Sequence, residues 1–202
     1  MIAIIDYEMG NLKSVEKAFF KMGYDAQVTD RIQVVKDAKA LVIPGVGAFP
    51  DAMDQLEKKG LIDAIRQGAV SGKPILGICL GMQVMFEKGF EGSERKGLGL
   101  LKGRIQRIPP GVKIPHMGWN QLSFHQKSPV FSGIENNTYA YFVHSYYAAG
   151  VQKEDLVATA EYGIQIPAVV QKENIIGLQF HPEKSSDKGL QMIKNYGELS
   201  KC

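Results

Sequence analysis

The chain has 202 residues, of which 45% are hydrophobic and 22% are charged, a composition ordinary for a globular protein with a full hydrophobic core. The formal net charge of +3 is spread along the chain without a basic stripe, so we expect no nucleic-acid partner. The N-terminus has no basic leader, and no apolar run approaches the roughly 20 residues of a membrane span. We therefore expect a soluble cytoplasmic protein without membrane contact. Of the two cysteines, Cys79 follows an apolar run, whereas we expect no role for Cys202, the last residue.

The first half of the chain alternates β-branched runs with helical patterns. Four short apolar runs predict strands, at residues 2–5, 26–29, 40–43 and 75–78. Apolar residues at helical spacing predict one helix over 12–22, which Gly23 ends, and another over 61–69, before the breaker Gly72-Lys73-Pro74. Strands that alternate with helices imply right-handed crossovers and a largely parallel sheet.

The second half is predicted to consist of short strands joined by turns. The strand-like runs lie at residues 103–108, 121–124, 139–143, 156–161, 168–171 and 175–180. Asn136-Asn137 and Lys172-Glu173-Asn174 are typical turn sequences, and a last helix is predicted from about Ser186. Together the patterns predict one α/β domain over residues 1–202, with helices flanking a mostly parallel sheet and a smaller antiparallel or mixed extension.

The strongest local motif is Gly77-Ile78-Cys79-Leu80-Gly81, between the strand at 75–78 and a helix predicted over 82–87. A strand, a sharp turn and a helix are the context of a nucleophile elbow, here with Cys in place of Ser. Side chains at 77 or 81 would clash in such a turn. The backbone N–H of Leu80 would be free to bind a developing oxyanion. The alternative is a buried Cys that packs like a small hydrophobic residue, and the five residues do not separate the two.

A second motif, Gln179-Phe180-His181-Pro182-Glu183, follows the last predicted strand. Active residues gather at the carboxyl ends of strands in open α/β sheets. His181 and Glu183 are two residues apart in an extended segment, so the carboxylate can orient the imidazole. Alone, this is better explained as a surface pair. With Cys79 it completes a Cys-His-Glu set, and the sequence distance between the motifs is no objection.

Other motifs are weaker. Pro44-Gly45-Val46-Gly47 follows a predicted strand and could present a backbone N–H to the same oxyanion, although without the other two motifs a plain strand-ending turn is the better explanation. No dinucleotide fingerprint or P-loop is present. The four histidines have no zinc-site spacing, so we expect neither a metal nor a cofactor.

These motifs resemble the active-site segments of class I glutamine amidotransferases. The similar stretches cover nearly the whole chain in the family's order, at residues 5–12, 44–49, 77–83, 115–120, 141–146 and 179–185. The resemblance implies the α/β fold of that family and glutamine as substrate. The segments at 6–11 and 115–120 narrow it to members that serve a (β/α)8-barrel cyclase in histidine biosynthesis, as a 1:1 heterodimer to which ammonia is passed.

The resemblance also implies a role for each matching residue. Cys79 would be the nucleophile, His181 the general base and acid, and Glu183 the group that orients His181. The oxyanion hole would be formed by backbone N–H groups of Leu80 and of the Val46-Gly47 segment. Glutamine would be held by Gln83, His144, Ser145 and Tyr146. The partner interface would include Asn11, Met117, Trp119 and Lys184.

Two other hypotheses remain open on the sequence. The chain could serve a different synthase, such as one for anthranilate or pyridoxal phosphate, with only the docking surface changed. It could also be a flavodoxin-like module with a redox-reactive Cys79, which would leave the His-Pro-Glu segment unexplained. Met117 and Trp119 favour a partner if they are exposed on one patch, and ordinary core if they are buried.

Overall fold

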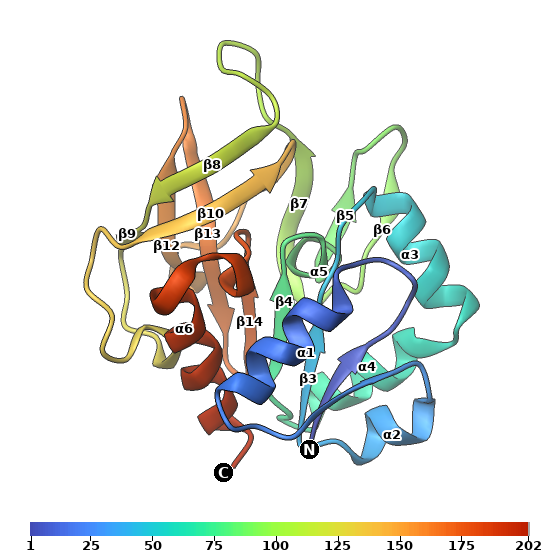
Figure 1. The fold of residues 1–202 in the computed structure, drawn as a ribbon. Coiled ribbons are helices and arrows are strands. Elements are labelled where there is room, and N and C mark those ends of the chain that lie inside the picture. The colour runs from blue at the N-terminus through green and yellow to red at the C-terminus, as the bar shows by residue number, and fades with distance from the viewer. Residues whose placement is uncertain (202) are drawn as a thin grey trace.

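Eight strands form the central sheet of the computed structural model, which describes residues 1–201 and leaves Cys202 outside the described part (Figure 1). The strand order is β2-β1-β3-β4-β14-β13-β12-β9. The parallel part contains β2 (Ala26–Thr29), β1 (Ile2–Ile5), β3 (Ala40–Ile43), β4 (Ile75–Ile78) and β14 (Ile175–Leu178). The antiparallel part adds β13 (Gln165–Lys172), β12 (Leu156–Glu161) and β9 (Ser123–Phe124).

Helices cover both faces of the parallel part. Ile2 and Ile4 of β1 pack into the apolar cluster under α1 (Leu12–Lys21) and α6 (Ser186–Leu199). Ala3 and Ile5 pack into the cluster on the other face, under α2 (Ile32–Asp37), α3 (Phe49–Lys58) and α4 (Leu61–Val70). Because successive side chains of a strand point to opposite faces, a strand covered on both sides needs an unbroken apolar run.

Two smaller sheets complete the fold. One has the order β11-β7-β5-β6 and is built from β11 (Tyr146–Ala149), β7 (Leu101–Arg107), β5 (Phe86–Gly89) and β6 (Arg95–Lys96). The other pairs β10 (Tyr139–His144) with β8 (His116–Gln121) in antiparallel register. The short elements are α5 (Leu80–Gln83) and the 3-10 turns η1 (Pro129–Phe131), η2 (Lys153–Asp155) and η3 (Pro182–Lys184). No helix in residues 1–201 is long and apolar enough to cross a membrane.

The strands predicted in the first half are confirmed, as are the helices over 12–22 and 61–69, the last helix and both predicted turns. The helix predicted over 82–87 is wrong, because α5 ends at Gln83 and 86–89 form β5. Pairing with β7 and the close fit of Gly89 on the Phe49 ring decide this segment, and neither contact is local. The strand predicted at 121–124 is divided between the end of β8 and β9. α2 and α3 were not predicted.

Candidate active site

Cys79 stands in the turn between β4 and α5 with φ +55° and ψ −110°, a backbone conformation that side-chain-bearing residues rarely adopt. The flanking glycines permit the turn. A Cβ at position 81 would lie 1.7 Å from the carbonyl oxygen of Ile43, and a Cβ at position 77 would lie 2.7 Å from backbone atoms of Gly81 and Met82. The prediction that side chains would clash at these positions is confirmed, and the turn has the geometry of a nucleophile elbow.

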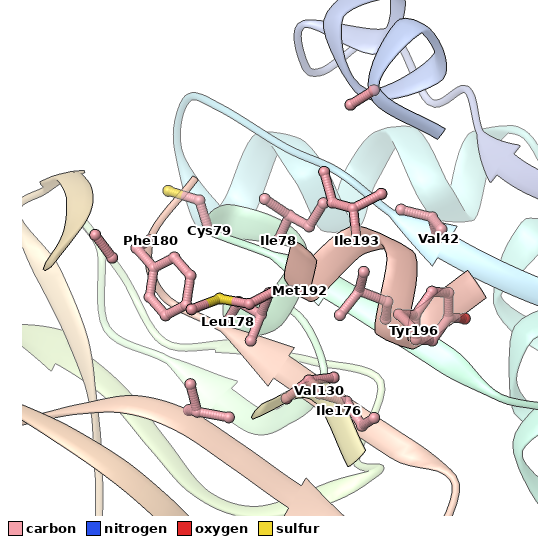
Figure 2. Packing of buried hydrophobic residues seen from close by; sticks show 14 of the residues in the cluster. Val42, Ile78, Cys79, Val130, Ile176, Leu178, Phe180, Met192, Ile193 and Tyr196 are labelled. Carbon is pink, nitrogen blue, oxygen red and sulfur yellow. The ribbon is translucent and has the colours of Figure 1, made fainter. Parts of the chain in front are cut away.

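The second motif is brought to this elbow by strand pairing. β14 pairs in parallel with β4, with Leu178 opposite Ile78, so both strands end at the same edge of the sheet. The backbone N–H of Cys79 donates to the carbonyl of Leu178 at 2.7 Å, and that of His181 donates to Tyr141 at 2.9 Å. Figure 2 shows Cys79 at the edge of the apolar cluster that contains Ile78, Leu178 and Phe180, with its sulfur directed away from the cluster.

His181 and Glu183 form a buried pair. Nδ1 of His181 lies 2.8 Å from Oε1 of Glu183, and the two side chains are only 3% and 2% exposed. The alternative of a surface pair is therefore wrong. Burial lowers the pKa of His181, but hydrogen bonding and charge from Cys79 and Glu183 outweigh it and raise the pKa to about 9.

The Cys79 thiol is close enough to His181 to contribute to the raised pKa of the imidazole. The remaining ring nitrogen of His181, Nε2, is buried and makes no hydrogen bond within residues 1–201. Catalytic hydrogen bonds are often long or poorly aligned in active sites without bound substrate. Cys79, His181 and Glu183 are therefore neighbours in the structure, as a nucleophilic triad would require.

Cys79 lines a pocket of about 340 Å³. The residues that line it are Val46, Gly47, Cys79, Leu80, Gln83, Glu91, Pro115, Val143, His144, Ser145 and Tyr146. All the residues predicted for the oxyanion hole and for glutamine are among them. The sequence reasoning missed Glu91, Pro115 and Val143; Pro115 and Val143 belong to segments already noted for their resemblance, whereas Glu91 had no local signal.

Behind the pocket, two amides are buried. Gln83 Nε2 donates to the carbonyl of Tyr146 at 2.9 Å and to Oε1 of Gln179 at 3.1 Å. Gln179 Nε2 faces the Cys79 sulfur at 3.9 Å, and Gln179 is fully buried. The amide nitrogen of Gln83 is therefore engaged with protein groups. Gln179 was not predicted to have a role, although it stands two residues before His181.

The residues predicted for the partner interface belong to β8, to η3 and to the N-cap of α1. Met117 and Trp119 are 60% and 53% exposed and, two residues apart on β8, share one face, so the alternative of ordinary core is wrong for both. Asn11 is exposed and accepts a hydrogen bond from the Ser14 N–H at the start of α1. Lys184 is exposed in η3, which packs against both α1 and β10. Within residues 1–201, no cluster of His, Cys, Asp or Glu side chains could hold a metal ion.

Comparison with known proteins identifies the family. The family model Glutamine amidotransferase class-I matches residues 3–197, so the chain belongs to the class I glutamine amidotransferases. Among curated relatives, the protein named imidazole glycerol phosphate synthase subunit HisH from Caldanaerobacter subterraneus subsp. tengcongensis is 53% identical, over 100% of both chains. The protein of the same name from Desulfitobacterium hafniense is 54% identical, over 98% of this chain and 94% of its own.

Solved structures share the fold at much lower sequence identity. A crystal structure of a glutamine amidotransferase has a TM-score of 0.79 at 19% identity, over 100% of both chains. The structure of PurLQS from Thermotoga maritima has a TM-score of 0.75 at 19% identity, over 98% of this chain and 95% of that chain. The α/β fold class expected from the sequence is thereby confirmed.

Proposed function

We propose that the chain is the glutaminase subunit of an imidazole glycerol phosphate synthase, which hydrolyses glutamine to glutamate and ammonia. The observation that carries the chemistry is the buried His181–Glu183 pair beside Cys79, which lines the pocket. The full-length similarity to two proteins of that name supports the choice of synthase. In this proposal the ammonia passes to a cyclase that forms imidazole glycerol phosphate and an aminoimidazole carboxamide ribonucleotide in histidine biosynthesis, in the cytoplasm.

The reaction begins with attack of the Cys79 thiolate on the side-chain amide carbon of glutamine. The oxyanion accepts hydrogen bonds from the backbone N–H of Leu80 and from an N–H of the Val46-Gly47 segment. With its pKa raised to about 9, His181 is an imidazolium at neutral pH and gives its proton to the leaving nitrogen. Ammonia departs and leaves a glutamyl thioester. The now neutral His181 takes a proton from water, which attacks the thioester and releases glutamate.

The pocket suggests how the amino-acid end of glutamine is held. Glu91 supplies a carboxylate to the lining, and this charge complements the α-ammonium group of a free amino acid. One carboxylate oxygen, Oε2, already accepts the backbone N–H of Phe49 at 2.8 Å, which fixes the side chain at the start of α3. Gln83, Ser145 and Tyr146 complete the wall. We propose that this arrangement selects glutamine over simple amides.

The Val46-Gly47 segment, which supplies one donor of the proposed oxyanion hole, is the proposed point at which the partner controls glutaminase activity. Gly47 has φ +109°, a conformation open to glycine, and a Cβ there would lie 2.7 Å from the Met9 side chain. If the peptide at Val46 faces away from the pocket in the free subunit, one of the two donors is missing. Loss of one such donor costs roughly 3 kcal/mol of barrier. We propose that docking of the partner turns this peptide and completes the oxyanion hole.

The proposed docking surface is the exposed face of the β8–β10 sheet, defined by Met117, Trp119, Tyr139 and Tyr141. Tyr141 stands opposite Trp119 in the register, and the two rings meet edge to face at 6.0 Å. Exposed aromatic and Met side chains on one face are typical of interface cores. We propose that a (β/α)8-barrel cyclase covers this face in a 1:1 heterodimer, with Asn11 and Lys184 at its edge.

The decisive experiment measures glutamate release with and without the cyclase subunit and its nucleotide substrate. We expect weak activity of the free chain and a large rise in the ternary mixture. The matched control is Cys79→Ala, which should lose glutamine turnover by at least about 10⁴-fold but leave synthesis from added ammonia intact. Full activity of the free chain would contradict the proposed control by the partner. Loss of ammonia-driven synthesis in the variant would contradict the separation of the two sites.

Two further measurements test the open alternatives. A glutamine-analogue affinity reagent should label Cys79, because the pocket recognises glutamine, whereas a redox module has no reason to bind it. A pull-down should return the cyclase. Recovery of an anthranilate or pyridoxal phosphate synthase instead would redirect the function while leaving the glutaminase chemistry unchanged.

A further inference from the structure

Two buried histidines lie beside the pocket and take no part in the hydrolysis described above. His116 on β8 and His144 on β10 are register partners, and they are only 2% and 6% exposed. Nδ1 of His116 lies 2.9 Å from Nε2 of His144. The ring of His116 is stacked between Phe142 and Tyr162, at centroid distances of 4.6 and 3.9 Å. Two imidazoles held this closely need tautomers in which one nitrogen donates and the other accepts.

Neighbouring backbone groups decide which nitrogen donates. The Asn120 amide is oriented by two of them, since Oδ1 accepts from the Gln121 N–H and Nδ2 donates to the carbonyl of Glu161, each at 2.8 Å. Nδ2 is therefore also the donor toward Nε2 of His116, at 3.2 Å. A neutral imidazole whose Nε2 accepts carries its proton on Nδ1, so His116 donates to His144. His144 then carries its proton on Nδ1 and donates to the carbonyl of Tyr146 at 2.8 Å.

The surroundings keep both rings neutral. Burial lowers the pKa of His116 to about 4. Burial also lowers the pKa of His144 to about 3. The hydrogen bond to the Tyr146 carbonyl acts to raise this pKa, and the charges of His116 and His181 act to lower it. Protonation of either ring would place two donors face to face. Both nitrogens of His144 are engaged with protein groups, so its ring offers no nitrogen to glutamine.

The Tyr146 carbonyl connects these hydrogen bonds between Asn120, His116 and His144 to the surroundings of Cys79. It accepts from His144 Nδ1 on one side and from Gln83 Nε2 on the other. Gln83 in turn bonds Gln179, whose amide faces the sulfur of Cys79. Tyr146 and Gln83 also line the pocket. A change in the tautomer of His116 would therefore alter the hydrogen bonds that hold Tyr146 and Gln83 at the pocket.

We infer that Asn120, His116 and His144 form a one-directional hydrogen-bond chain that positions the Tyr146 carbonyl and, through it, the glutamine pocket. His144 is a positioning residue in this arrangement and not a ligand of glutamine. The inference rests on the proposed glutaminase function. It adds to that function a device outside the triad, which starts on β8, the strand that also carries Met117 and Trp119.

The first test is spectroscopic and independent of activity. Ring-nitrogen NMR of the chain labelled with ¹⁵N-histidine reports which nitrogen of each ring is protonated. The signals are assigned with the single variants His116→Gln, His144→Gln and His125→Gln. We expect both His116 and His144 to be neutral and protonated on Nδ1. A proton on Nε2 of either ring would overturn the inferred direction of the chain.

The second test removes the hydrogen-bond donor of Asn120 with almost no change in side-chain volume. In Asn120→Asp, the residue loses its amide donor, so a neutral His116 gives its proton from Nε2 to the carboxylate and can no longer donate to His144; ring-nitrogen NMR of the variant shows that the ring is neutral. We expect the KM for glutamine, measured with the cyclase bound, to rise by about tenfold or more, because the wall that binds glutamine is misplaced. A melting temperature of the variant above the assay temperature shows that the variant is folded in the assay.

A matched pair of variants separates positioning from packing. His116→Asn places an amide donor where Nδ1 stood, whereas His116→Gln places its amide near the Nε2 position and leaves His144 without a donor. We expect the Asn variant to keep KM within about threefold of the wild-type value and the Gln variant to resemble Asn120→Asp. His125→Gln, at a histidine whose Nε2 bonds Thr159 at 2.8 Å outside the pocket, should change neither KM nor kcat.

The outcomes distinguish the two proposals. Wild-type kinetics in Asn120→Asp, or equal loss in both His116 variants, would overturn the positioning role and leave the glutaminase function standing. A wild-type chain that turns over no glutamine with any partner would overturn the proposed function and, with it, the role of the chain in glutamine binding.

Discussion

The parallel strands and the β8–β10 pair differ in how they are covered. β1, β3, β4 and β14 are buried along their whole length, because helices lie on both faces (Figure 1). Along β8 and β10, less exposed residues alternate with more exposed ones, so one face of this pair packs inward and the other is open. The covered region places Cys79 and His181 at neighbouring strand ends. The half-covered region supplies both a pocket wall and an apolar surface.

This difference suggests that the covered region holds Cys79 rigidly and that the half-covered region responds to a partner. The proposed nucleophile, Cys79, is held at φ +55° and requires rigid support, which two packed layers provide. The pocket wall at residues 143–146 follows a sheet that is packed on one side only, so we expect a partner on its open face to influence the wall. We expect substitutions in the proposed triad to have the largest effect, substitutions at the packed elbow a smaller one, and substitutions on the open face the smallest.

The largest effect is expected at Glu183. In the wild type, kcat/KM should fall as the pH rises through about 9, because the raised pKa keeps His181 protonated below that value and the proton is needed by the leaving nitrogen. Glu183→Gln removes the charge that helps to raise this pKa. We expect the alkaline limb to move to lower pH and the rate to drop by roughly 10²–10⁴-fold. The measurement is a pH profile of glutamate release.

The control for this change is Glu135→Gln, the same substitution at an exposed position of the η1–β10 connection. It should leave the profile unchanged. An alkaline limb at the same pH in Glu183→Gln and the wild type would show that this carboxylate does not set the charge state of His181.

The next effect is expected at the elbow. Gly81→Ala should lower the free energy of unfolding by at least about 3 kcal/mol, because the new Cβ would lie 1.7 Å from the Ile43 carbonyl oxygen and β3 would have to move. Gly68→Ala is the matched control on α4. Its Cβ would meet only side-chain atoms, of Leu41 at 3.2 Å and of Lys73 at 3.6 Å, and a helix interior favours Ala, so we expect a change within about 1 kcal/mol. Urea denaturation measures both, and equal values would refute the packing argument.

The smallest effect is expected on the open face. Trp119→Ala should weaken binding of the cyclase by about 2 kcal/mol, or roughly 30-fold in Kd, because a large aromatic anchor is lost. The glutaminase activity of the free chain should not change. Phe20→Ala is the control, since Phe20 is 81% exposed in the last turn of α1, away from β8. Calorimetric titration with the cyclase compares them, and a Kd for Trp119→Ala within twofold of wild type would remove this residue from the interface.

Local patterns were sufficient for the covered region and weaker elsewhere. The run Ile75–Ile78 is buried on both faces, and its unbroken apolar character announced the strand. α3 was not predicted, although Phe49, Ala52, Met53 and Leu56 are buried at helical spacing. The segment after α5 has helical composition, yet it forms β5 because a partner strand is available. Such a choice depends on residues distant in the sequence.

The sequence by itself determined the alternating strands and helices, the elbow glycines and the residue types of the triad, because each follows from local spacing and local sterics. Only the tertiary structure decided that β14 lies beside β4 and so brings His181 to Cys79. It also decided that Gln179 faces the sulfur and that both ring nitrogens of His144 are occupied. These contacts join residues far apart in the chain, such as Gln179 and Cys79, which are 100 positions apart. Hydrogen bonds of that kind follow from strand order and register, which no local window of the sequence contains.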